Sequence, residues 1–135
     1  MKNTLILFLL IPLWGFAQNE KENKHPIDIQ FEDCKSGNTA EMIACANKEY
    51  DTWDKEMNKY YKLLMGVLGT EEKAKLKEAQ RRWITYRDAE IEFAATLNRN
   101  KEGTMWPVFF GSTRASIVRT RALELIEYYE VETMN

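Results

Sequence analysis

The sequence has very little of the chemistry on which most catalytic sites depend. Its 135 residues include one histidine, His25, which lies in a charged N-terminal segment. There is no glycine-rich loop of the kind that cradles phosphates, and no serine stands in the G-x-S-x-G pattern of a nucleophile elbow. The paired carboxylates Glu71 and Glu72 fall at the start of an expected helix, where the helix dipole already accounts for them. We therefore expect a protein that is not an enzyme and needs no cofactor.

Cysteine is equally scarce, because Cys34 and Cys45 are the only two in the chain. With no second cysteine pair and no histidine outside the N-terminal segment, a zinc site is poorly supported. In an oxidising compartment two cysteines favour a disulfide, and the alternatives are free thiols or half of a metal site. A disulfide closing this loop should stabilise the fold by about 3 kcal/mol.

The sequence also lacks a surplus of positive charge, since 19 lysines and arginines face 21 aspartates and glutamates. Nucleic acids and anionic membrane surfaces both attract clustered lysine and arginine, so neither is an expected partner. A mildly acidic chain would suit a basic protein partner instead.

The one long apolar run, Leu5 to Phe16, follows Lys2 at the N-terminus and ends beside the small residues Gly15 and Ala17. This arrangement is typical of a secretory signal peptide covering residues 1–17. The run is shorter than the roughly 20 residues that a spanning helix needs, so no membrane anchor should remain after cleavage. The sequence therefore predicts an exported protein, either periplasmic or secreted.

Removal of residues 1–17 leaves 118 residues with a net charge of about −3, enough for one domain. Residues 18–33 are charged and show no helical period, so we expect a flexible polar lead in which PIDIQF forms at most one short extended piece. Residues 34–132 should form the helical domain.

Apolar residues spaced by three and four predict an all-α bundle of three main helices. The first begins at Asn38 or Thr39 and runs to residues 66–69. The second begins with Thr70 as its N-cap and ends at residues 98–100. The joint between them, LGTEE, is so short that the two helices must form an antiparallel hairpin. The third helix is expected to begin at Ser112 or Thr113.

The segment before the third helix, residues 101–113, combines helix-breaking glycine and proline with large apolar side chains. It could fold over the open end of the bundle. Alternatively, it could expose an aromatic patch that binds a partner beside the free N–H groups of the following helix start. The candidate residues for partner binding are Trp106, Phe109, Phe110, Gly111, Ser112, Thr113 and Arg114.

The stretch AQRRWITYRDAE places the polar side chains of Gln80 and Arg87 on the same helix face as Trp83. A buried guanidinium needs acceptors, so we expect an internal network in which Arg87 pairs with a carboxylate of the first or second helix. The alternative is a ligand site on this stripe. The expected structural polar core comprises Gln80, Trp83, Tyr86, Arg87, Asp88 and Arg121.

Together these features resemble the lysozyme inhibitor LprI-like family of small exported proteins. The resemblance covers residues 33–129 and is carried by MNKYYKLL, AQRRWITYRDAE, FGST and RTRALEL, with the two cysteines eleven positions apart. It implies an all-helical fold stapled by a disulfide and, for the family's namesake, inhibition of lysozyme. Many relatives carry a second cysteine pair, where this chain has Ile91 and the string TRASIV.

Two functions are consistent with these observations. In the first, the protein inhibits a lysozyme through protein–protein contacts, with Ser112, Thr113 and Arg114 at an exposed turn as the inserted element. In the second, it is a structural or interaction module of the cell envelope that binds another exported protein and does not inhibit lysozyme. Neither hypothesis sets an oligomeric state.

Overall fold

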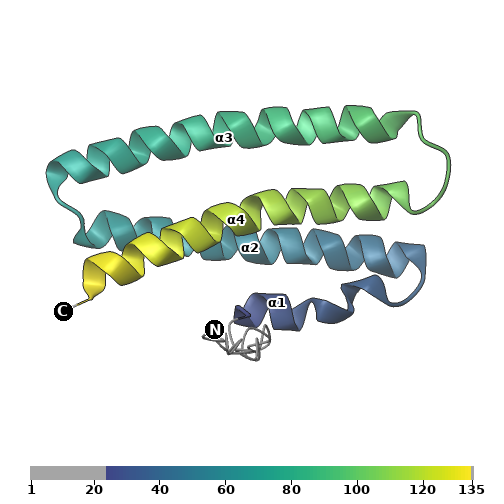
Figure 1. The fold of residues 1–135 in the computed structure, drawn as a ribbon, viewed down its shortest axis with the longest axis horizontal. Coiled ribbons are helices and arrows are strands. Elements are labelled where there is room, and N and C mark those ends of the chain that lie inside the picture. Colours follow the sequence, from purple (N-terminus) through teal and green to yellow (C-terminus); the bar gives the residue numbers. More distant parts are fainter. Residues whose placement is uncertain (1–23, 135) are drawn as a thin grey trace, which may run out of the picture.

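The computed structural model describes residues 24–134, so the expected signal peptide lies outside the described residues. Helices account for all of the regular structure in this range (Figure 1). They are α1 (Pro26–Gln30), the 3-10 helix η1 (Glu32–Lys35), α2 (Thr39–Val67), α3 (Thr70–Arg99) and α4 (Trp106–Thr133). No helix between residues 24 and 134 is long and apolar enough to cross a membrane. The all-α prediction with three main helices is confirmed.

The two helices α2 and α4 lie side by side and form the centre of the molecule. They run parallel, because α3 returns the chain from the end of α2 to the start of α4 (Figure 1). The long helix α3 lies on one side of this pair, and α1 lies on the other. The protein is therefore layered, with α2 and α4 between α3 and α1.

Local sequence signals explain where α2 and α3 begin. The side chain of Asn38 accepts from the Glu41 backbone N–H at 3.1 Å, and the Glu41 carboxylate accepts from the Asn38 N–H at 3.1 Å, which forms a capping box. Asn38 is therefore the N-cap, as expected. At the next helix the N-cap is Gly69 rather than Thr70, because the Glu72 carboxylate accepts from the Gly69 N–H at 2.6 Å.

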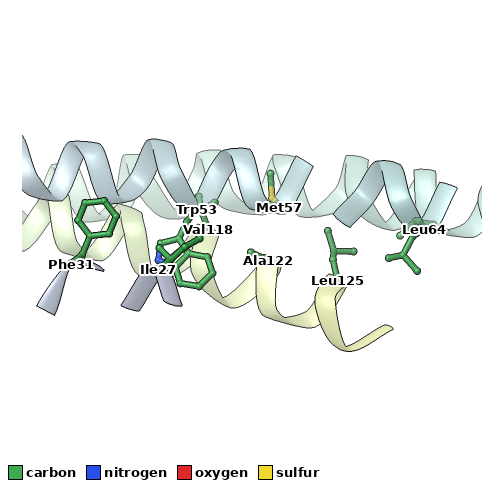
Figure 2. Close-up of a cluster of buried hydrophobic side chains, with 9 residues drawn as sticks. Ile27, Phe31, Trp53, Met57, Leu64, Val118, Ala122 and Leu125 are labelled. Carbon is green, nitrogen blue, oxygen red and sulfur yellow. The ribbon is translucent and has the colours of Figure 1, made fainter. Parts of the chain in front are cut away.

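The hydrophobic core lies between α2 and α4 (Figure 2). Trp53 and Leu64 of α2 and Val118 and Leu125 of α4 are its largest fully buried side chains. Burying an apolar side chain of this size is worth about 1.5–3 kcal/mol, so the contact between α2 and α4 contributes strongly to folding. Cluster members outside these two helices are Ile27, Phe31 and Leu76.

The N-terminal segment is helical, which corrects the expected flexible or extended lead over the part of residues 18–33 that is described. Pro26 occupies the first turn of α1, and the Nδ1 of His25 accepts from the Ile27 backbone N–H at 3.2 Å. Ile27 and Phe31 are spaced four apart, and both are buried in the core. This anchoring stabilises a helix that is too short to be stable alone.

The last helix begins at Trp106, so the predicted loop at residues 101–113 is shorter than expected. Pro107 fits the first turn of a helix, where its missing N–H costs nothing. Gly111 lies inside α4 at a point where α2 passes close by. A Cβ at Gly111 would stand 2.9 Å from the Cβ of Ala46, so glycine fits this position. Ser112 and Thr113 are therefore not an N-cap, and no free N–H groups are available beside them.

Candidate protein-binding groove

A disulfide between Cys34 and Cys45 joins η1 to α2. Their Cα atoms lie 5.4 Å apart, which is within the normal range for a disulfide. The prediction of a disulfide is confirmed. Because η1 follows α1 directly, this crosslink also holds α1 against the bundle and fixes one wall of a groove.

The groove runs between the α1–η1 segment and the first turns of α4, with α2 at its floor, and has a volume of about 720 Å³. Its apolar side chains come from all of these elements. They are Phe31, Met42, Ala46, Met105, Val108 and Phe109. The groove thus has an apolar surface, and one of its walls is present only when the N-terminal segment is folded.

An ion pair crosses the groove from α1 to α4. The Nε and Nη2 of Arg119 each donate to one carboxylate oxygen of Asp28, both at 2.6 Å. The Asp28 side chain is 16% exposed, and this contact lowers the pKa of its carboxyl and raises the pKa of Arg119. The two-point geometry makes this pair a fixed clamp rather than a mobile surface contact.

The charged residues of the groove carry a net negative charge. Lys24 pairs with Glu32. The negative charges of Asp28 and Glu49 both raise the pKa of Arg119. Three carboxylates therefore face two cations. No group of three or more His, Cys, Asp or Glu within residues 24–134 is placed to hold a metal ion. The arrangement can accept an apolar side chain together with a basic group.

Only some of the residues predicted for partner binding face this groove. Phe109 and Ser112 line it, and the Phe109 side chain is 55% exposed. Thr113 is exposed and donates to the Phe109 carbonyl at 2.9 Å. By contrast, Gly111 is buried against α2.

The other candidates serve mainly local packing. Arg114 lies over the ring of Tyr50 at 4.4 Å and over that of Phe110 at 5.7 Å. The indole N–H of Trp106 donates to the carbonyl of Glu102 at 2.7 Å, and Trp106 and Phe110 are half-buried.

Sequence reasoning missed Asp28 and Met105 as groove residues. The sequence predicts Asp28 in a flexible lead, although the spacing of Ile27 and Phe31 favours one helical face. Met105 precedes α4 and is 40% exposed. No local pattern marks it, because its role depends on α1 lying beside α4.

Of the residues expected in the polar core, Gln80 and Arg121 are buried and contact each other. Both are 8% exposed, and the Nε of Arg121 donates to the Oε1 of Gln80 at 3.0 Å. Arg121 also donates to Glu124 at 2.8 Å. Trp83 is half-buried against the hydrophobic cluster.

Tyr86 and Asp88 lie at the surface and not in a polar core, whereas the Arg87 side chain is only 19% exposed and pairs with a carboxylate of its own helix, the second of the expected helices. Tyr86 is 56% exposed, and Arg87 bonds to the carboxylate of its neighbour Asp88 at 2.7 Å instead of reaching another helix. The Asp88 side chain is 61% exposed. The guanidinium of Arg87 also lies 5.3 Å from the centre of the Trp83 ring, so Asp88 and this ring are its partners.

Comparison with known proteins places this architecture among related chains. A family model described as "Lysozyme inhibitor LprI" matches residues 32–125. An uncharacterized protein of Rhizobium meliloti (strain 1021) is 32% identical, in an alignment covering 73% of this chain and 79% of that protein. The crystal structure of an uncharacterized protein from Burkholderia thailandensis matches with a TM-score of 0.74 at 26% identity. That match covers 81% of this chain and spans 56% of the Burkholderia protein.

Proposed function

The chain belongs to the lysozyme inhibitor LprI family, and we propose that it is an exported, non-enzymatic protein that binds and inhibits a lysozyme. The predicted signal peptide, residues 1–17, would deliver it to the periplasm or the medium, where cell-wall lytic enzymes act. Its binding surface would be the groove between α1–η1 and α4.

The observation that carries this assignment of the surface is the exposure of Phe109 at an apolar groove. Phe109 is 55% exposed although its neighbours Val108 and Gly111 are buried. Aromatic side chains at the centre of a contact area are the residues that most often dominate binding energy. Phe109 and Met105 would therefore anchor the partner, with Ser112 and Thr113 beside them.

The charges of the groove favour a basic partner such as a lysozyme. The carboxylates of Asp28, Glu32 and Glu49 outnumber the cations Lys24 and Arg119 along it. Complementary charge speeds encounter and fixes orientation more than it adds affinity. Inhibition would then follow from steric exclusion, because a bound protein of about 118 residues beside the cleft keeps out the long glycan substrate.

An inhibition assay tests both the function and the surface. Purified residues 18–135 should slow cell-wall lysis by at least one of several lysozymes in a saturable manner. Phe109→Asp should weaken inhibition by about 30-fold, the loss of a typical hot-spot residue. Tyr128→Asp is the matched control, because Tyr128 lies on the same helix, is 52% exposed and is remote from the groove.

The outcomes separate the alternatives. If none of the lysozymes is inhibited at micromolar concentration, the inhibitor function is wrong, and a partner recovered by cross-linking would favour an envelope interaction module. If Phe109→Asp inhibits as well as the unchanged protein does, the function stands but the groove is not the binding surface.

A further inference from the structure

One flank of α3, next to its inward side, carries a second helical stripe whose large side chains are exposed. The inward side of this helix buries Leu76, Gln80 and Ala94. The stripe, here named the outer seam, follows the alternating spacing of a helix–helix contact surface. Its residues are Lys75, Ala79, Arg82, Tyr86, Glu90, Phe93 and Leu97.

The large side chains of the outer seam are exposed to solvent. Tyr86 and Phe93 are each 56% exposed, and Leu97 is 52% exposed. In Figure 1, α3 forms one side of the molecule, and no other described helix lies beyond it. Three large apolar side chains aligned on one exposed helix face are typical of an interaction surface.

We propose that the outer seam binds the outer seam of a second copy of this chain, with the two α3 helices antiparallel and Tyr86 on the two-fold axis. In such a pair, residues equally far before and after Tyr86 face each other. The seam spacings of four, three and four residues are the same in both directions from Tyr86. An isologous contact of this kind closes on itself as a dimer.

The pairs that this symmetry creates are complementary in charge and size. Arg82 and Glu90 lie four positions on either side of Tyr86, so each Arg82 meets Glu90 of the second copy. Ala79 and Phe93 lie seven positions away, so a small side chain meets a large one. Every such pair occurs twice in the dimer.

The outermost pair and the present contacts of Arg82 are consistent with this arrangement. Lys75 and Leu97 lie eleven positions from Tyr86, where the aliphatic stem of lysine can cover leucine. The Arg82 side chain is 81% exposed and bonds Glu78 of its own helix at 2.8 Å. An exposed pair of this kind is weak, so the guanidinium can turn toward a carboxylate across the axis.

The length of the seam sets the strength of the contact. From Lys75 to Leu97 it extends about 33 Å at 1.5 Å per residue. A contact between two single helices of this length belongs to the small interfaces, below about 1,200 Å². The dimer is therefore reversible and concentration-dependent. It does not rest on lysozyme binding, because α3 lies on the opposite side of the molecule from α1 and its groove (Figure 1).

Charge reversal tests the pairing directly. Sedimentation equilibrium of residues 18–135 should show a monomer–dimer equilibrium. Arg82→Glu and Glu90→Arg should each weaken dimerisation at least about tenfold, because like charges then meet twice across the axis. The double variant Arg82→Glu/Glu90→Arg should restore it to within about threefold. Circular dichroism should be unchanged, since Arg82 is exposed and Glu90 is only partly buried.

The proposal would be overturned if the double variant does not restore dimerisation. It would also be overturned if the chain remains monomeric up to about 1 mM, a concentration at the weak end of specific binding. Cysteine trapping checks the register independently. Tyr86→Cys should form a covalent dimer on mild oxidation, because the two Cα atoms approach across the axis within disulfide reach. Phe93→Cys should not, because Phe93 faces Ala79 of the second copy. Faster trapping at Phe93 than at Tyr86 would contradict the two-fold axis at Tyr86.

Discussion

Arg121 on α4 donates from its Nε to the Oε1 of Gln80 on α3 at 3.0 Å, with both side chains 8% exposed. The Nε2 of the same amide donates to the Sδ of Met57 on α2 at 3.6 Å. One glutamine side chain thus links α3 to both central helices. Because a thioether is a weak acceptor, the bond to Arg121 carries most of the polar contribution.

Gln80→Leu should therefore destabilise the protein by about 1–3 kcal/mol, because it leaves the buried Nε of Arg121 without its acceptor. Arg87→Ala is the comparison: its ion pair with the exposed Asp88 should contribute less than about 1 kcal/mol, and its contact with the Trp83 ring about 0.5–1 kcal/mol more. Urea denaturation followed by circular dichroism measures both. A larger loss from Arg87→Ala than from Gln80→Leu would show that the polar clamp lies elsewhere.

The pair of Asp28 and Arg119 should make stability depend on pH. The folded protein holds the pKa of Asp28 below its usual value, mainly because Arg119 donates to its carboxylate. The stabilisation is therefore complete above the unfolded pKa of about 3.9 and is lost as the pH falls through the lower folded pKa.

Asp28→Asn should lower the free energy of unfolding by about 1 kcal/mol at neutral pH, a modest value because Arg119 is 38% exposed. The difference from the unchanged protein should shrink below about pH 4. Thermal unfolding of both proteins measures this difference in stability. The experiment runs from about pH 2 to pH 7, a range that includes the usual pKa values of aspartate. A difference that stays constant down to the lowest pH would contradict the ion pair.

Two glycines should respond in opposite directions to alanine. Gly111→Ala should destabilise by about 1–3 kcal/mol, because the added Cβ would stand 2.9 Å from that of Ala46 and push α4 from α2. Gly66→Ala should stabilise by about 0.5–1 kcal/mol, because nothing lies within 4 Å and alanine favours the helix. Differential scanning calorimetry compares the two, and equal effects would show that helix propensity alone decides.

Loss of the disulfide should release the N-terminal wall of the groove. The double variant Cys34→Ser/Cys45→Ser should lose about 3 kcal/mol of stability. Because only the burial of Ile27 and Phe31 then holds the N-terminal segment to the bundle, limited proteolysis should cut first within residues 24–37. Reductant should destabilise the unchanged protein to the same extent and leave the variant unaffected. A variant as stable as the unchanged protein would mean that packing alone holds η1.

Local patterns predict α2 and α3 well, because the sequence signals for the start and end of each lie within or beside that helix. The capping box at Asn38 and the end of α3 at Arg99 agree with the expected bounds. The N-terminal helix was missed because its stability is tertiary. Ile27 and Phe31 belong to the same buried cluster as Trp53, and Cys34 bonds Cys45, none of which a short window reveals.

The sequence predicts that a buried polar network exists, but it identifies only some of the residues that form it. Residues spaced by three and four form two adjacent stripes on α3, one with Gln80 and one with Tyr86 and Phe93. Sequence periodicity does not decide which stripe faces inward, because that depends on where α4 lies. The sequence predicts the guanidinium beside Gln80 at Arg87, whereas Arg121 supplies it in the structure.

The most direct test of the proposed groove is hydroxyl-radical footprinting of the protein with and without a lysozyme that it inhibits. Binding at the groove should suppress oxidation of Met105 and Phe109, which are 40% and 55% exposed in the free protein. Oxidation of Tyr128, at the far end of the same helix, should be unchanged. If Met105 and Phe109 are oxidised as readily in the complex as in the free protein, the groove between α1 and α4 is not where lysozyme binds.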